Sequence, residues 1–184
     1  MIETDLAAVL IRAVLGVTMI AHGWNHAFGG GRLPGTARWF ESIGIRPGRV
    51  HAAVATVTEL GAGALLLLGL LNALAAAAVI GTMAVALVAN HLRNGFFIFR
   101  PGEGYEYVLM IIVVSAALAA LGPGRISLDE LAGVELDGAW GLLTAVVLGG
   151  GGAALLLAAC WRPGSVKAGG AGEGEATGEA TEQA

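Results

Sequence analysis

The stretch HAAVATVTELGAGALLLLGLL, residues 51–71, decides the fold, because it is mostly apolar and yet carries a carboxylate, Glu59, near its middle. An apolar run of about 20 residues is long enough for a helix to cross the hydrocarbon core of a bilayer. An ionisable group at that depth is costly, and it normally faces a bundle interior or a partner. The stretch therefore predicts a membrane-spanning helix whose carboxylate faces other helices.

The composition of the whole chain also favours a lipid environment. Of its 184 residues, 56% are hydrophobic and 13% are charged, whereas soluble proteins contain about 25% charged residues. The single cysteine, Cys160, excludes an internal disulfide and a thiolate metal cluster. The N-terminus carries two acidic residues and no early base, so we expect the first apolar segment to stay as a membrane anchor.

Five segments are long and apolar enough, or nearly so, to span a membrane. Residues 72–92 follow 51–71 with almost no linker, which predicts a helical hairpin. The last segment contains four consecutive glycines, 149–152, and small residues allow neighbouring helices to approach closely in lipid. The predicted fold class is an all-α, polytopic membrane helix bundle. Its predicted spans are residues 6–28, 50–71, 72–92, 105–121 and 139–161.

The predicted organisation has three parts. Residues 1–133 form a four-helix membrane domain, with a short interfacial helix within 29–49 that Thr36 is expected to cap. Residues 134–161 form an additional span. Residues 162–184 are rich in Gly, Ala, Glu and Thr, and we expect them to be a disordered tail. Between the fourth and fifth spans, Ser127 and Glu130 have the spacing of a helix capping box.

The arginines and lysines predict the orientation of the bundle. Eight of the ten bases lie in segments 29–49, 93–104 and 162–184, which share one side of the membrane if there are five spans. The loops on the other side carry one base, Arg125, and Arg12 lies within the first span. Since basic loops stay in the cytoplasm, we expect a multi-pass protein with the N-terminus outside and the tail cytoplasmic.

Polar residues inside the spans form the candidate site. In this orientation all four histidines of the chain lie near the cytoplasmic face, and Glu59 lies deeper, roughly 13 Å in at about 1.5 Å per residue. The chain offers no complete set of metal ligands, so no metal site is predicted. The candidates for handling protons are Glu59 and Glu106, and those for binding a cofactor are His22, His26, His91 and Arg12.

Each candidate also has a purely structural interpretation. Glu59 would then be a buried carboxyl that is paired with Arg12 or is neutral and hydrogen-bonded. Glu106 would be a carboxylate that the helix dipole favours at the start of a span. His22 and His26 share one helix face through their i, i+4 spacing, but interfacial histidines are often only solvated.

Several motifs follow one another in a specific order and spacing. They are RAVLG and AHGWNHAFG in the first span, ELGAGALLLLGL in the second, GFF and GEGYEYVLMI before and into the fourth, and GPGRISLDELAG after it. Together, over residues 10–133, they resemble the DoxX family of small bacterial membrane proteins. The resemblance implies a four-helix bundle in a bacterial plasma membrane. His26 stands where the family commonly has a lysine, and residues 139–161 lie beyond the family core.

The same resemblance implies an accessory role in redox chemistry, because some DoxX members are associated with quinone-linked oxidation of sulfur compounds or with membrane oxidoreductase complexes. A quinone is then a compatible cofactor, and other oxidoreductase subunits are the expected partners. Two other functions stay open. One is a small ion-coupled transporter, which would need to form a homo-oligomer, and the other is a membrane scaffold that recruits soluble redox enzymes. No phosphate-binding loop and no nucleic-acid motif is present.

Overall fold

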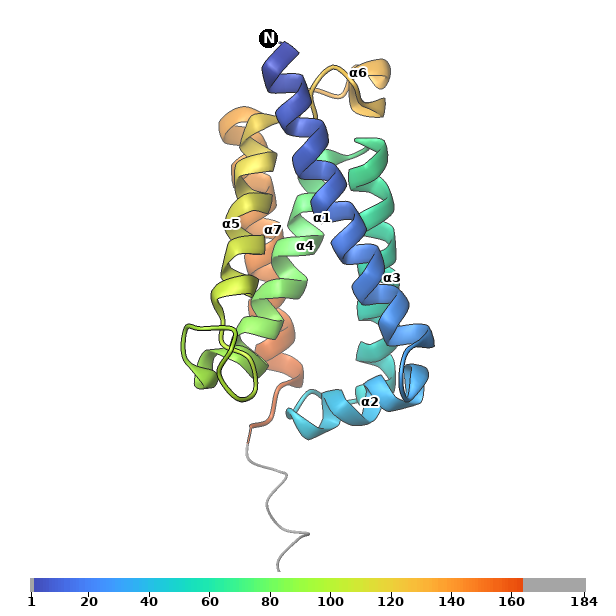
Figure 1. Cartoon of the computed structure of the whole chain (residues 1–184), viewed down its shortest axis with the longest axis vertical. Coiled ribbons are helices and arrows are strands. Elements are labelled where there is room, and N and C mark those ends of the chain that lie inside the picture. Colours follow the sequence, from blue (N-terminus) through green and yellow to red (C-terminus); the bar gives the residue numbers. More distant parts are fainter. Residues whose placement is uncertain (1, 164–184) are drawn as a thin grey trace, which may run out of the picture.

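The structure is a computed structural model that describes residues 2–163. Five helices run along the long axis of the molecule, α2 lies across one end, and the short α6 lies at the other end (Figure 1). The elements are α1 (Ile2–Phe28), α2 (Arg32–Ser42), α3 (Gly48–Leu68), α4 (Asn72–Ala86), η1 (Leu87–His91), η2 (Leu92–Asn94), α5 (Glu106–Leu121), α6 (Leu128–Ala132) and α7 (Gly138–Cys160).

The predicted all-α membrane bundle is confirmed. Four helical segments are long and apolar enough to cross a membrane: α1, α3, α4 with its continuation to Asn94, and α7. The fourth predicted span is the shorter apolar helix α5. The predicted spans agree with these helices to within a few residues at each end, and all but the first two residues of the predicted tail lie outside the described part of the chain.

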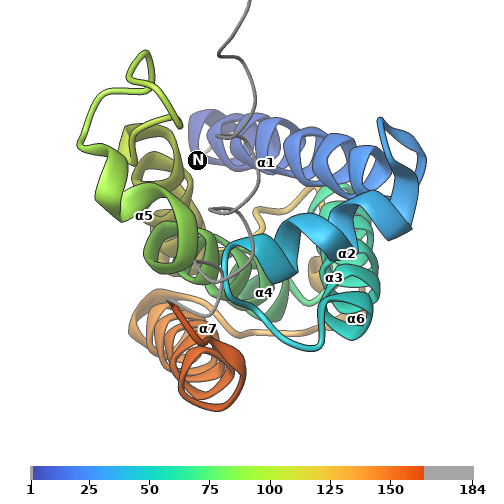
Figure 2. The same cartoon turned by 90° about the horizontal axis from the view of Figure 1, so that it is seen from below.

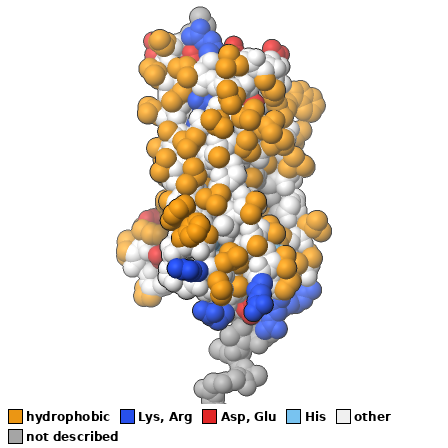
Figure 3. Space-filling view, turned by 90° about the vertical axis from the view of Figure 1, so that its right-hand side faces the viewer, with side chains coloured by type: hydrophobic (Ala, Val, Ile, Leu, Met, Phe, Trp, Pro, Cys, Tyr) orange, Lys and Arg blue, Asp and Glu red, His pale blue; other side chains and the backbone are white. Residues whose placement is uncertain are grey.

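The two ends of the bundle differ in charge. Arginines gather at the end that carries α2, and apolar side chains cover the flank (Figure 3). We call this the arginine end, and the opposite one the α6 end. The arginine end is defined by Arg32, Arg38, Arg46, Arg49, Arg93, Arg100 and Arg162.

Glycines allow two pairs of helices to pack at backbone distance. A Cβ built on Gly63 of α3 would lie 2.6 Å from the carbonyl oxygen of Gly16 of α1. A Cβ on Gly149 of α7 would lie 2.5 Å from the carbonyl oxygen of Ala77 of α4. The glycine run therefore serves close packing at Gly149 alone, since a Cβ at 150, 151 or 152 would meet nothing within 4 Å.

At the α6 end, Asp129 joins α6 to the turn between α3 and α4. Its carboxylate accepts hydrogen bonds from the backbone N–H groups of Leu71, at 2.7 Å, and Asn72, at 2.9 Å. Its own N–H donates to the carbonyl oxygen of Gly69 at 2.9 Å. The predicted Ser127 cap is also present, because the N–H of Glu130 donates to the Ser127 hydroxyl at 3.2 Å. These bonds hold α3 and α4 together at this end.

At the arginine end, the segment after α2 is joined to the end of α7. The N–H of Arg46 donates to the carbonyl oxygen of Cys160 at 3.0 Å, and the N–H of Arg162 donates to that of Gly44 at 2.8 Å. The indole N–H of Trp161 donates to the carbonyl oxygen of Ile43 at 3.0 Å. We call this set of bonds the 43–46 strap. It closes the bundle beneath α2.

The predicted capping role of Thr36 is wrong. Helix α2 begins at Arg32, so Thr36 lies inside it. Its hydroxyl instead donates to the carbonyl oxygen of His26 at 3.0 Å. The bond ties α2 to the last turn of α1, which holds α2 across the end of the bundle.

Candidate functional site

A cavity of about 900 Å³ lies inside the bundle, and most of its lining residues belong to the arginine half. It exists because α3 and α4 meet at their connecting turn near α6 and diverge towards α2 (Figure 1). Helix α1 packs against α3, and α7 packs against α4, so that these pairs form opposite walls. Helix α2 crosses the open end, and Trp39 and Phe40 on it also line the cavity.

All four histidines of the chain line this one cavity. They come from three separated parts of the sequence: His22 and His26 from α1, His51 from α3 and His91 from η1. Glu59 lines it from α3. Apolar and small side chains make up most of the remaining wall, so the cavity combines an apolar body with a group of titratable side chains.

His26 and Glu59 are in contact across the α1–α3 interface. The His26 Nε2 atom lies 3.4 Å from the Glu59 Oε2 atom, and the two side chains are 15% and 4% exposed. Glu59 Oε2 and His26 Nδ1 are buried and have no hydrogen-bond partner among the described residues. Gly23 permits the approach, since a Cβ there would lie 3.1 Å from the Cβ of Glu59. The partner of Glu59 is therefore His26. The positions of these residues in the sequence did not indicate this contact.

The ring of His91 is held in one orientation by its neighbours. Its Nδ1 donates to the carbonyl oxygen of Glu103 at 2.9 Å, since a carbonyl only accepts. In the neutral ring, Nε2 is then an acceptor that faces the amide nitrogen of Asn90 at 3.4 Å. Asn90 and His91 both lie on η1, the π-helical continuation of α4. Such π-helical turns are frequent at functional sites.

Two of the predicted site residues do not line the cavity. Glu106 is half-buried in the first turn of α5, and its backbone N–H donates to the carbonyl oxygen of Phe96 at 2.9 Å. Arg12 lies at the α6 end, where its Nη2 donates to the carbonyl oxygen of Ile126 at 2.6 Å. A Cβ on Gly69 would overlap Arg12 Nη1, so the guanidinium packs on the C-terminal end of α3. That position suits a cation near a helix C-terminus.

Some residues of the cavity wall were not among the predicted candidates. The Phe40 ring lies beside that of His26, with centroids 5.9 Å apart. Asn25 and Tyr107 also line the cavity. The i, i+3 spacing from His22 was the one sequence signal for Asn25. The position of Phe40 depends on how α2 folds back, which no local pattern specifies. Among residues 2–163, no cluster of three or more His, Cys, Asp or Glu side chains is arranged to hold a metal ion.

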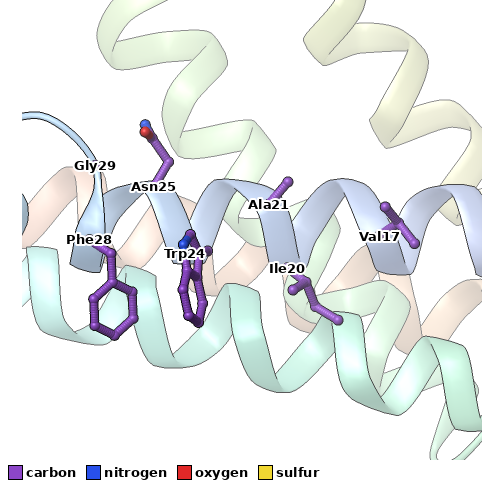
Figure 4. A pocket seen from close by; sticks show the side chains of 7 residues that line it. All are labelled: Val17, Ile20, Ala21, Trp24, Asn25, Phe28 and Gly29. Carbon is purple, nitrogen blue, oxygen red and sulfur yellow. The ribbon is translucent and has the colours of Figure 1, made fainter.

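A shallower groove of about 480 Å³ runs along the outside of α1 (Figure 4). All but one of its lining residues belong to α1 itself, with Gly29 following the helix. The Trp24 and Phe28 rings lie side by side in it, with centroids 4.3 Å apart. Because the groove lies between neighbouring side chains of a single helix, we assign it no separate function.

Of the comparisons with known proteins, one found a match, and it covers part of the chain. No curated protein and no solved structure matches it. The family model described as DoxX matches residues 7–92. The matched segment supplies all four histidines and Glu59, whereas α5, α6 and α7 lie beyond it. The resemblance that the motifs of the first two spans indicated is confirmed over residues 7–92, where the chain matches the DoxX family model, and four of its helical segments are long and apolar enough to cross a membrane.

Proposed function

We propose that the protein is an accessory subunit of a quinone-linked membrane oxidoreductase, and that its cavity holds a quinone head group beside His26 and Glu59. One observation carries the proposal. A carboxyl group that is 3% exposed and incompletely hydrogen-bonded faces a largely apolar cavity in a membrane bundle. Buried ionisable groups in membrane helices commonly mark ligand sites or proton routes. DoxX proteins are often associated with quinone-related or oxidoreductase function, which agrees with this assignment.

The residues of the chain would handle protons and leave electron transfer to a partner. A quinone becomes a quinol by taking up two electrons and two protons. The electrons would come from a partner oxidoreductase, since the single cysteine leaves no redox-active pair in this chain. The Glu59–His26 pair would deliver the two protons to the head group one after the other, through Glu59 Oε2 and His26 Nε2, and would be reprotonated from the arginine end after each transfer. His22 lines the same cavity one helical turn farther from that end than His26.

We also propose that the arginine end faces the cytoplasm of a bacterial cell and that the N-terminus lies outside. The arginines gathered around α2 support this orientation because basic segments are retained in the cytoplasm. In this arrangement residues 1–133 form the DoxX-like unit. The additional span at 134–161, which corresponds to α7, completes the cavity wall through Gly149 and Leu156.

Lipid extraction from purified protein tests the proposed function. The full-length protein, Glu59→Gln and the control Glu130→Gln would be purified in a mild detergent, and the bound quinone would be measured by mass spectrometry. Glu130 is exposed on α6 and does not line the cavity. We expect the unmodified protein and the control to retain quinone, and Glu59→Gln to retain about tenfold less, a loss of about 1.4 kcal/mol. Absence of quinone from the unmodified protein contradicts the proposal.

The same preparation distinguishes the two other functions. Copurified soluble enzymes without quinone would favour the membrane scaffold. Substrate-dependent ion flux in liposomes, abolished by Glu59→Gln, would favour the transporter. Quinone together with enzyme partners supports the accessory subunit.

A further inference from the structure

The cavity reaches the surface of the bundle on two sides that differ in chemistry. Between α1 and α5, its wall includes exposed polar groups on Asn25, Glu103 and Tyr107. Between α3 and α7, it includes Val54, 51% exposed, and Leu148, 54% exposed. Helices α1 and α7 lie on opposite sides of α4 (Figure 2). We call these openings the polar mouth and the apolar mouth.

We propose that the cavity binds an amphiphile from the bilayer, with its polar head at Glu59 and His26 and its apolar chain leaving through the apolar mouth between α3 and α7. This inference rests on the proposed function, and it adds the shape of the ligand and the route of its tail.

The size and lining of the cavity support a ligand with a long chain. A volume of about 900 Å³ is near the upper limit of the roughly 300–1,000 Å³ of ligand pockets, so a single-ring head group would leave most of it empty. Along α4 the wall extends from Leu74 to Asn90, about 24 Å at a rise of about 1.5 Å per residue. Gly81 and Ala77 are small residues in this wall, and Leu74 and Met83 give it apolar surface. A flexible apolar chain fits such a surface.

The buried carboxyl group places the head of the ligand. Glu59 is 3% exposed, and its Oε2 atom has no hydrogen-bond partner among the described residues. A buried polar atom without a hydrogen-bond partner costs free energy. A ligand whose head carries a hydroxyl or a carbonyl group is therefore stabilised there by a hydrogen bond to the Glu59–His26 pair. The head therefore lies against α3 and α1, with the apolar wall of α4 and α7 beside it.

The apolar tail of the ligand leaves through the apolar mouth, because in the polar mouth it would remove water from polar side chains. An apolar tail placed between α1 and α5 would cover the polar groups of Asn25, Glu103 and Tyr107 and cost the free energy of desolvating them. A tail that passes Val54 and Leu148 instead remains in contact with apolar side chains until it reaches the hydrocarbon of the membrane.

Two neighbouring glycines on α7 provide a matched test. A Cβ on either Gly151 or Gly152 meets nothing within 4 Å, but Gly152 lines the cavity and Gly151 does not. Gly152→Leu places a side chain in the apolar mouth, whereas Gly151→Leu places the same side chain outside it. Binding of two benzoquinones with the same ring, one with a single isoprene unit and one with a long isoprenoid chain, would be measured on full-length protein in nanodiscs.

We expect Gly152→Leu to weaken binding of the long-chain quinone at least about tenfold, or about 1.4 kcal/mol, with less than a twofold effect on the short-chain quinone. Gly151→Leu should change neither. Equal binding of the long-chain quinone by both variants overturns the tail route and leaves the proposed function standing. If Gly152→Leu abolishes binding of both quinones and leaves the melting temperature unchanged, the tail route is also overturned. If the unmodified protein binds neither quinone, the proposed function itself fails.

Discussion

His26 Nε2 lies 3.4 Å from Glu59 Oε2, and this contact joins α1 to α3 at the wall of the cavity. The pair is neutral overall when the carboxyl and the imidazole share one titratable proton. Loss or gain of a proton gives the pair a net charge inside the membrane bundle, where charge is costly. The pair is therefore most stable as carboxylate with imidazolium or as carboxylic acid with imidazole, since both forms are neutral overall.

A double-mutant cycle on this pair tests the contact. His26→Gln and Glu59→Gln should each change the free energy of unfolding, and the effects should be non-additive by about 0.5–3 kcal/mol because the side chains touch. The measurement is chemical unfolding in detergent. As a control, His51→Gln combined with Glu59→Gln should be additive within about 0.5 kcal/mol, since no ion pair between them is present in residues 2–163. Additivity in both cycles would show that His26 and Glu59 do not interact.

Arg12 should support stability and not ligand binding. Arg12→Met removes a buried, charged hydrogen bond to Ile126 and should lower the free energy of unfolding by about 1.5–3 kcal/mol. Quinone retention per folded molecule should stay unchanged, because Arg12 does not line the cavity. The control is Arg125→Met. The Arg125 side chain is 61% exposed in its pair with Asp5, so the expected loss is below about 1 kcal/mol. Equal losses for both variants would refute the structural role of Arg12.

Substitution of adjacent glycines in α7 by alanine should have different effects on the stability of the bundle. Gly149→Ala places a Cβ 2.5 Å from the carbonyl oxygen of Ala77 and should destabilise the bundle by about 1–3 kcal/mol through overpacking. Gly150→Ala meets nothing within 4 Å and should be neutral or stabilising by up to about 1 kcal/mol, because alanine favours helix. Melting temperatures in detergent give the comparison. Similar melting temperatures for the two variants would mean that α4 and α7 do not approach at Gly149.

The proposed orientation has a direct test in cells. Alkaline phosphatase fused after Ala184 should be inactive in bacteria, because the arginine end and the chain beyond it would be cytoplasmic. The same enzyme fused before Met1, behind an export signal, should be active. Strong phosphatase activity of the C-terminal fusion would reverse the proposed orientation.

Local patterns in the sequence were enough to predict the helices and their hairpin. The apolar lengths around Glu59 and the absence of a linker before Asn72 specify a spanning pair. The Ser127 cap was predictable for the same reason, since it depends on residues three positions apart. Membrane helices are well predicted because every backbone group in lipid must be hydrogen-bonded within its own segment.

The contacts between helices were not predictable in the same way. The sequence offered Arg12 as a partner for Glu59 because both are charged and lie within spans, but the axial alignment of α1 with α3 places His26 beside Glu59 and Arg12 beside Gly69. Thr36 looked like a helix cap, yet its hydroxyl bonds to the preceding helix. These outcomes depend on which faces of α1, α2 and α3 meet, and small residues such as Gly16 and Gly63 determine that through steric fit.

The 43–46 strap has a mechanical consequence. The halves of the bundle are linked covalently through the α3–α4 turn, reinforced by Asp129, whereas at the arginine end the strap joins them by backbone and indole hydrogen bonds. We expect such a molecule to bend as a hinge whose fixed end is the turn and whose displacement is greatest at the strap. A soluble enzyme that bound this strap would alter the width of the cavity without entering the membrane. Assembly of a complex would thereby regulate how long a lipophilic substrate stays bound.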